Sequence, residues 1–149
     1  MNLVAPVSSI MAKDIPTVMP KDSVLRVKEI FEKSKVFHIP VVKYKKVVGM
    51  INRSDFSSFC SRLSRQWSDF ADNSKWLRGH TADEIMSDVP LSLECCDRIA
   101  VAVEMLRGNG FMALPVVDND NLIGLITTHE VMEALGKEKA GENDYYTIY

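Results

Sequence analysis

The sequence predicts an α+β fold made of two copies of one β-α-β-β-α unit. An apolar run around Pro40 recurs 75 positions later around Pro115. Because an internal repeat fixes the architecture of a chain, we expect two such units with one buried seam between them. The same offset relates several further identical pairs: Met11 and Met86, Val41 and Val116, Val42 and Val117, Gly49 and Gly124, Ile51 and Ile126.

In the first copy, residues 7–11 predict a helical turn and residues 14–18 a short strand. Ser23 is the expected N-cap of a helix. Segments 37–42 and 47–51 predict the two strands of a hairpin, whose lysine-rich turn is most simply a solvated tip. The helix is indicated by apolar residues at helical spacing, namely Val24, Val27, Ile30 and Phe31.

The second copy has the same order of elements. We expect a helical turn, a short strand, a helix, a hairpin and a last helix that begins at Thr127 and is closed by Gly136. The acidic hairpin turn lacks the Gly and the closing Glu of a calcium loop. These elements fall at 82–86, 89–93, 99–107, 113–117 with 122–126, and 127–135.

The two copies should share one apolar core. Its predicted residues are Val41, Val48, Ile51, Val116, Ile123 and Ile126.

A segment between the copies, residues 57–81, has no counterpart in the repeat. Its apolar residues recur at helical spacing, so the helix that begins near Asp55 should continue to about Ala71. These side chains should cover the gap between the units or pack against a second chain, and we expect a homodimer. The residues concerned are Phe59, Leu63, Trp67 and Phe70.

Composition and charge exclude several classes of protein. The chain has 149 residues, of which 46% are hydrophobic and 26% charged, as in soluble globular proteins. A net charge of −2 gives no general attraction to nucleic acid or to an anionic membrane. There is no signal peptide pattern and no apolar run of bilayer length, so we expect a cytoplasmic protein.

Reactive groups are sparse in the sequence. The three cysteines, Cys60, Cys95 and Cys96, form neither a disulfide framework nor a CxxC pair, which favours small buried side chains in a reducing compartment. No activated nucleophile, metal-ligand cluster or Gly-rich phosphate loop is recognisable. The sequence therefore argues against an enzyme and against a metal site.

Each copy ends in a recurring pattern: an apolar-Pro-Val-Val run, a hairpin, and an apolar-Gly-apolar-apolar segment that leads to a polar residue and, three positions on, an acid. This pattern resembles the CBS domain, named for cystathionine β-synthase, and two in tandem resemble a Bateman module. The resemblance implies two repeats packed about a pseudo-twofold axis with two clefts. It places the first repeat at 7–56, a helical connector at 57–81, the second repeat at 82–136 and a tail at 137–149.

The resemblance also implies a ligand. Many members of the family bind AMP, ADP, ATP or S-adenosylmethionine in these clefts, with ribose, adenine and phosphate contacts at fixed motif positions. In the first cleft these positions are Asn52 and Asp55 for ribose, Thr17, Ile39 and Pro40 for adenine, and His38 and Ser54 for phosphate. In the second cleft they are Thr127 and Glu130 for ribose, Ser92, Leu114 and Pro115 for adenine, and His129 for phosphate.

Elementary chemistry supports the ribose positions, with one competing explanation. An ionised carboxylate can accept hydrogen bonds from both hydroxyls of a cis-diol, and a helix start offers backbone N–H groups to a phosphate. The same residues fit helix N-caps with an acidic third position. Asn52 replaces the hydroxyl residue of the family pattern and Glu130 is longer than Asp, so we expect the Asp55 cleft to bind slightly better.

Two functions follow as hypotheses. The first is a stand-alone regulatory module that binds an adenosine-containing ligand and transmits its state to a protein partner. The alternative is an assembly or scaffold protein with vacant clefts that acts through its dimer or connector surface. Ligand-dependent stabilisation distinguishes the two, because only the first has a ligand.

Overall fold

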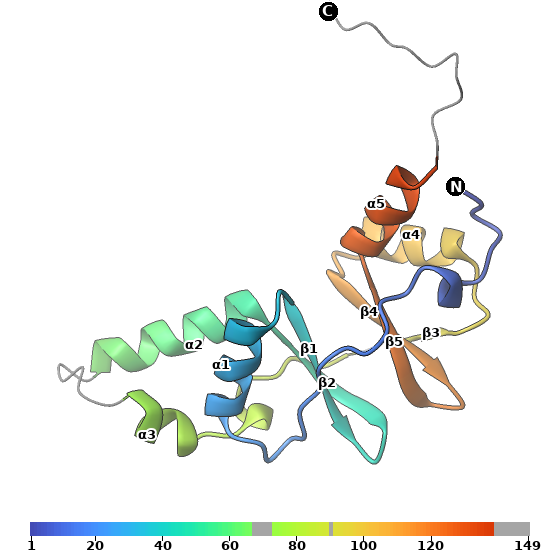
Figure 1. Cartoon of the computed structure of the whole chain (residues 1–149). Helices are drawn as coiled ribbons and strands as arrows, with labels where there is room; N and C mark the ends of the chain where they lie inside the picture. The colour runs from blue at the N-terminus through green and yellow to red at the C-terminus, as the bar shows by residue number, and fades with distance from the viewer. Residues whose placement is uncertain (67–72, 90, 139–149) are drawn as a thin grey trace, which may run out of the picture.

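The chain forms two α+β halves, one for each sequence repeat, which lie side by side in the computed structural model (Figure 1). The structure describes residues 1–66, 73–89 and 91–138. The first half contains α1 (Val24–Lys33), β1 (His38–Lys43), β2 (Lys46–Asn52) and α2 (Arg53–Gln66). The second contains β3 (Leu93–Glu94), α4 (Ile99–Gly108), β4 (Ala113–Asp118), β5 (Asn121–Thr127) and α5 (Thr128–Gly136). Short elements precede or join them: η1 (Val7–Ser9), α3 (Asn73–Arg78) and η2 (Ala82–Glu84).

Both predicted hairpins are present and have the same register. β1 pairs antiparallel with β2, and β4 pairs antiparallel with β5. Both two-residue turns have positive φ angles, which is the geometry that matches the twist of a tight hairpin. The equivalent pairs are Ile39 with Ile51 and Leu114 with Ile126, and the turn residues are Tyr44 and Lys45 (φ 51° and 65°) and Asn119 and Asp120 (φ 48° and 65°).

The short strand ahead of each helix is smaller than predicted. In the second repeat it is the two-residue β3, which runs parallel to β4. In the first repeat only one bridge forms, between Val18 and Val41. The cause is local: Asp14 has a left-handed backbone conformation (φ 53°), and Pro16 has no N–H to donate to a neighbouring strand.

The helices follow the predicted apolar stripes. Ser23 is the N-cap of α1, and its Oγ accepts a hydrogen bond from the Arg26 backbone N–H at 3.3 Å. Val24, Val27 and Phe31 are buried on the inner face of α1. The repeat architecture and the α+β class are therefore confirmed at the level of individual elements.

The buried core is double, which corrects the prediction of one shared core. Four of the six predicted residues are fully buried, but Val48 and Ile123 are each 37% exposed. Each repeat has its own apolar cluster. Each cluster also contains a residue from the short helical turn at the start of the other repeat, Ala82 in one case and Val7 in the other. One cluster contains Val18, Val27, Phe31, Ile39, Val41, Ile51 and Ala82; the other contains Val7, Leu93, Ala102, Leu114, Val116 and Ile126.

Glycines allow this exchange of turns. A Cβ at Gly49 would lie 2.4 Å from Met86 Sδ, and a Cβ at Gly124 would lie 2.4 Å from Met11 Sδ. The lack of a side chain lets each leading segment cross the facing strand of the other repeat. Backbone hydrogen bonds complete the crossing, from Met50 N to Ser87 O and from Ala12 N to Leu125 O, each at 2.9 Å.

The described part of the connector contains two helices, and residues 79–81 that follow them are not helical. α2 reaches Gln66, and α3 packs against α1 with Leu77 buried. The predicted continuation to Ala71, with Trp67 and Phe70, lies outside the described residues, as does the tail from residue 139. A single long connector helix is therefore not confirmed.

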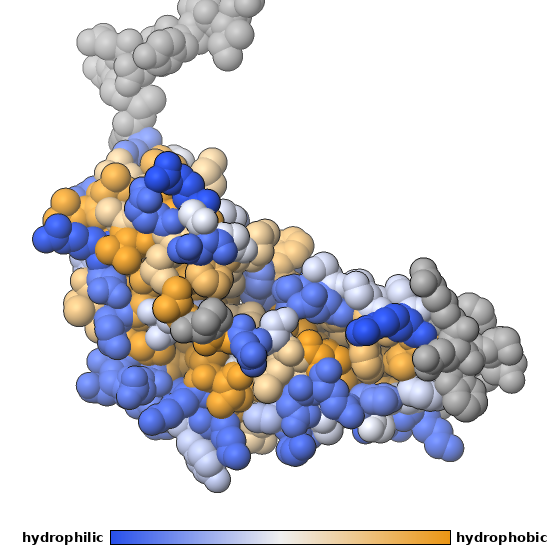
Figure 2. Space-filling model, turned by 180° about the vertical axis from the view of Figure 1, so that it is seen from behind, coloured by the Kyte–Doolittle hydropathy of each residue, from blue (hydrophilic) through white to orange (hydrophobic). Residues whose placement is uncertain are grey.

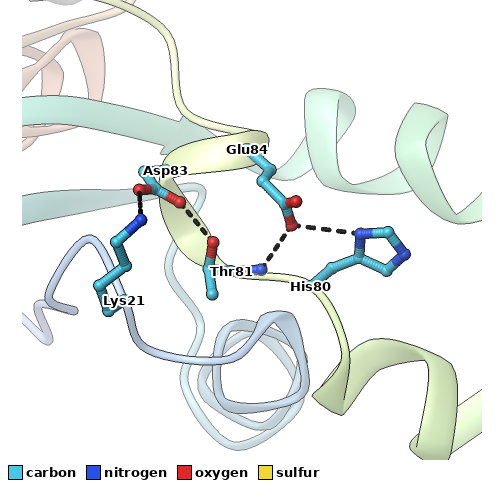
Figure 3. Close-up of polar contacts among 5 residues, drawn as sticks. All are labelled: Lys21, His80, Thr81, Asp83 and Glu84. Carbon is cyan, nitrogen blue, oxygen red and sulfur yellow. Dashed lines mark hydrogen bonds and ion pairs between the residues drawn. The ribbon is translucent and has the colours of Figure 1, made fainter.

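A polar cluster surrounds η2, and one ion pair in it joins the two repeats (Figure 3). Lys21 Nζ lies 2.9 Å from Asp83 Oδ2, and the Glu84 carboxylate accepts from the Thr81 backbone N–H at 2.7 Å. His80 Nδ1 lies 3.1 Å from the same carboxylate oxygen.

Two further observations concern the whole described part of the chain. The three cysteines are free; Cys96 is exposed, and Cys60 and Cys95 are only half-buried, so the prediction of buried cysteines is wrong. Cys95 and Cys96 lie in the turn between β3 and α4. None of the helices within the described ranges is long and apolar enough to cross a membrane.

Candidate functional site

The N-terminal end of α5 is closed by a capping box. Thr127 Oγ1 accepts a hydrogen bond from the His129 backbone N–H at 3.1 Å. The Glu130 carboxylate accepts from the Thr127 backbone N–H at 2.8 Å and from its hydroxyl at 2.5 Å. Both bonds use the same oxygen, Oε2, so the second carboxylate oxygen of Glu130 is not used by the cap.

The corresponding end of α2 is built differently. Asn52 Oδ1 accepts from the Asp55 backbone N–H and from the Ser54 hydroxyl, each at 2.7 Å. The Asp55 carboxylate does not turn back to the Asn52 backbone; its Oδ2 accepts from Ser87 Oγ of the second repeat at 3.3 Å. This helix start therefore has an amide cap and a carboxylate that faces the other repeat.

A cleft of about 550 Å³ opens between the start of β1 and the start of α5, and we call it the α5 cleft. Both repeats line it. Its apolar wall includes three large side chains that remain about two-thirds exposed: Phe37 (66%), Met112 (64%) and Met132 (65%). On its polar side are His38, Thr127, Thr128, His129 and Glu130, with Lys35 at the edge.

A smaller cleft of about 220 Å³ lies at the pseudo-symmetric position, and we call it the α2 cleft. Asn52 from the first repeat and Ser87 from the second line it, together with the segment that precedes β4. His38 and Met112 line both clefts, so they form a common wall. The other lining residues are Met50, Asp88, Val89, Leu91, Gly110, Phe111 and Ala113.

The structure places His38 beside predicted site residues of both repeats, whereas the sequence assigned it to the first cleft alone. His38 lines the α2 cleft with Asn52, and it also lines the larger cleft with Thr127, His129 and Glu130. The reason is the pseudo-twofold packing, which places the strand start of one repeat against the helix start of the other. A repeat offset identifies equivalent positions but does not indicate which of them face each other.

Several predicted residues do not line these two clefts. Ile39 and Leu114 are buried in the apolar clusters, and Pro40 is buried beside Ile39. Ser92 and Pro115 border a separate hollow of about 230 Å³ next to Lys46. The side chains of Thr17, Ser54 and Asp55 are also absent from both linings, although Asp55 contacts Ser87 of the α2 cleft.

Sequence reasoning missed the apolar wall of the α5 cleft. Ile15, Met112 and Met132 were not assigned to any site, and Phe37 was assigned only to a strand. The available signal was the position of Phe37 and Met112 directly before the two apolar-Pro runs. Figure 2 shows the apolar surface concentrated over the second repeat and its junction with the first.

The electrostatics of the α5 cleft depend on His38. Burial lowers the pKa of His38 below the usual histidine value, and the nearby Glu130 carboxylate partly offsets this shift. His38 is therefore neutral at pH 7 and offers one donor and one acceptor nitrogen. An apolar slot with a neutral imidazole, a hydroxyl, a carboxylate oxygen and a helix start can hold a flat ring that carries a polar substituent.

Comparison with known structures identifies the fold that this chain shares with other proteins. The chain is 26% identical to CBSX2 of Arabidopsis thaliana, crystallised in complex with AMP; the match covers 88% of this chain and 96% of that one, with a TM-score of 0.71. The CBS domain pair of protein MJ0100, crystallised with 5-methylthioadenosine and S-adenosyl-L-methionine, is 22% identical with a TM-score of 0.71. That match covers 91% of this chain and 99% of that one, and it shows the shared fold.

Curated relatives show the same unit inside longer proteins. Inosine-5′-monophosphate dehydrogenase of Methanocaldococcus jannaschii is 27% identical over 126 residues, which are 83% of this chain and 22% of that protein. The chain spans less than a quarter of the length of the curated relatives it matches. The CBS domain profile matches residues 7–62 and again residues 82–137. The chain therefore belongs to the CBS domain family and contains two copies of the domain in tandem.

Proposed function

We propose that the protein is a regulatory module that binds an adenosine-containing ligand in the α5 cleft and transmits the bound state to a protein partner. The observation that carries the proposal is the pairing of an exposed apolar wall with a polar helix start in one cleft lined by both repeats. Its volume of about 550 Å³ is within the range of about 300–1,000 Å³ that is usual for ligand pockets. The AMP complex of CBSX2 supports the choice of ligand class.

In this proposal the base lies against Phe37 and Met112, and the ribose hydroxyls meet Thr127 and the second oxygen of Glu130. A phosphate or a comparable polar substituent then lies near His38 and His129. The capping box does not prevent this role, because only one oxygen of Glu130 is used by the cap. No catalytic step is proposed for the module.

The α2 cleft is a second, weaker candidate for the same ligand class. Its volume of about 220 Å³ favours the opposite order of affinity from the one that the sequence predicts. If Asp55 binds the ribose there, Asp55→Asn should weaken binding by about 1.5–3 kcal/mol, the contribution of hydrogen bonds to a charged group. Equal affinity in calorimetric titrations of wild type and Asp55→Asn would leave Asp55 with a structural role only.

A specific observation supports the scaffold alternative. α5 has no buried residue, and Met132 and Leu135 are 65% and 41% exposed. Such a face is suited to a second copy of the chain, and light scattering that shows a monomer at micromolar concentration would argue against the homodimer. The cytoplasmic location and the absence of nucleic-acid and membrane partners stay predictions.

Thermal unfolding in the presence of AMP, ATP or S-adenosylmethionine tests the proposed function, with ribose 5-phosphate as a control that lacks the base. A ligand at about a hundred times its dissociation constant should stabilise the protein by about 2.7 kcal/mol. Phe37→Ala should remove the stabilisation, whereas Glu104→Gln, a surface change on α4, should retain it. If none of the adenosine compounds stabilises the wild-type protein at millimolar concentration, the scaffold function is favoured.

A further inference from the structure

Arg53, the first residue of α2, forms a concentrated set of contacts with the end of the preceding helix and loop. Its guanidinium Nη2 donates hydrogen bonds to Phe31 O and Val36 O, each at 2.9 Å, and its Nε donates to Val36 O at 3.3 Å. The planar guanidinium can donate several such bonds at once, which a lysine cannot do. Arg53 therefore fixes the chain between α1 and β1.

The same guanidinium lies over two aromatic rings. Its central carbon is 5.2 Å from the ring centroid of Phe31 and 5.3 Å from that of Phe37. The Arg53 backbone N–H also donates to Phe37 O at 2.9 Å. Phe37 is thus held through both its main chain and its ring, although the residue is 66% exposed.

Phe37 forms part of the apolar wall of the α5 cleft, whereas Arg53 follows Asn52, which lines the α2 cleft. We propose that Arg53 is a positioning residue that holds the Phe37 ring in place as the stacking surface for a ligand in the α5 cleft. The binding part of this inference rests on the proposed function; the ordering of Phe37 does not. An ordered ring binds a ligand more tightly, because less side-chain entropy is lost on binding.

The second repeat has no such arrangement. The positions equivalent to Arg53, Phe37 and Phe31 are Thr128, Met112 and Leu106. The single hydroxyl of Thr128 cannot form the three hydrogen bonds that the Arg53 guanidinium donates to carbonyl oxygens. Met112 is an unbranched, adaptable side chain. The α5 cleft therefore contains the anchored Phe37 ring, which does not line the α2 cleft, whereas the equivalent Met112 is flexible and lines both clefts.

The ordering of Phe37 can be tested without any ligand. In protein that carries 4-fluorophenylalanine at its six phenylalanine positions, the Phe37 fluorine resonance is assigned by its loss in Phe37→Leu. Arg53→Lys, and Arg53→Met where it folds, should move this resonance towards the value of an unfolded chain and narrow it. An unchanged Phe37 resonance in a folded Arg53→Lys protein would overturn the proposal.

The effect on binding is tested by a double-mutant cycle with AMP as the probe. Arg53→Lys should weaken AMP binding about twofold to fivefold, the range for an exposed cation–π contact, and should have almost no further effect in the Phe37→Leu background. An equal loss in both backgrounds would show that Arg53 acts by another route and would overturn the proposal. If wild type binds no AMP, the proposed function fails, and the fluorine spectrum alone decides whether Arg53 positions Phe37.

Discussion

The two repeats have the same fold but use their helix starts in different ways. At α5, Glu130 closes a capping box over Thr127, and this end faces the larger cleft. At α2, Asn52 caps the helix, and the Asp55 carboxylate contacts Ser87 beside the smaller cleft. The motif residues alone do not determine the space available for a ligand, because the opposite wall of each cleft comes from the other repeat.

The largest expected effect tests whether the repeats are equivalent in stability. Ile51→Ala and Ile126→Ala each remove a fully buried side chain from one apolar cluster and should each lower the free energy of unfolding by about 2–5 kcal/mol. Chemical denaturation should remain a single transition, because each cluster includes the leading turn of the other repeat. Val48→Ala and Ile123→Ala, at 37% exposed positions, serve as controls and should cost less. Two separate transitions would show that the repeats fold independently.

A smaller effect on stability should distinguish the two glycines, Gly49 and Gly124, at which the leading segment of one repeat crosses a strand of the other. Gly124→Ala places a Cβ 2.9 Å from the backbone oxygen of Ala12, whereas the three atoms nearest to a Cβ at Gly49 all belong to the Met86 side chain. Overpacking typically costs about 1–3 kcal/mol, and Gly124→Ala should be the more destabilising change because a backbone cannot rotate away. Thermal and urea denaturation of the two variants measure the difference. The reverse order would contradict the described crossing.

The two helix starts should also differ in stability. Glu130→Ala removes the acceptor of two hydrogen bonds to Thr127 and should cost about 1 kcal/mol, as is usual for the loss of a cap. Asp55→Ala removes one long hydrogen bond to Ser87 and should cost less. Urea denaturation of both variants checks this, and equal costs would mean that the Asp55 carboxylate also stabilises its helix.

The smallest expected effect concerns pH. Burial lowers the pKa of His38 in the folded protein, so the unfolded chain binds a proton more readily and stability falls as the pH drops below about 6.5, the value for an unperturbed histidine. His38→Gln should reduce the slope of stability between pH 7 and pH 5. The equivalent position in the second repeat is Ala113 and contributes no such term. Urea denaturation at several pH values measures the slope; an unchanged slope would contradict the prediction.

Local features were predictable because they depend on residues close together in the chain. The hairpins, the Ser23 cap and the Thr127 capping box all follow from contacts within a few positions. The repeat and the pseudo-twofold fold followed from the constant offset. The extent of the first short strand was overestimated, because the left-handed backbone of Asp14 leaves no signal in the apolar pattern.

The assembly of the site was not predictable, because it depends on contacts between distant segments. The packing of the leading turns places Val7 in the second cluster and Ala82 in the first, and His38 and Thr127 line one cleft. Arg53 is a similar case. Its carbonyl partners Phe31 and Val36 lie 22 and 17 positions away, so the sequence shows only a basic residue within a capping pattern.

The most direct test of a ligand site shared by both repeats is a titration of isotope-labelled protein with AMP, followed by amide chemical shifts. Our account predicts that Phe37 and His38 of the first repeat shift together with Thr128, His129 and Glu130 of the second, with one dissociation constant. Shifts confined to one repeat, shifts only on the outer face of α2, or no shifts at all would contradict a site formed between the two repeats.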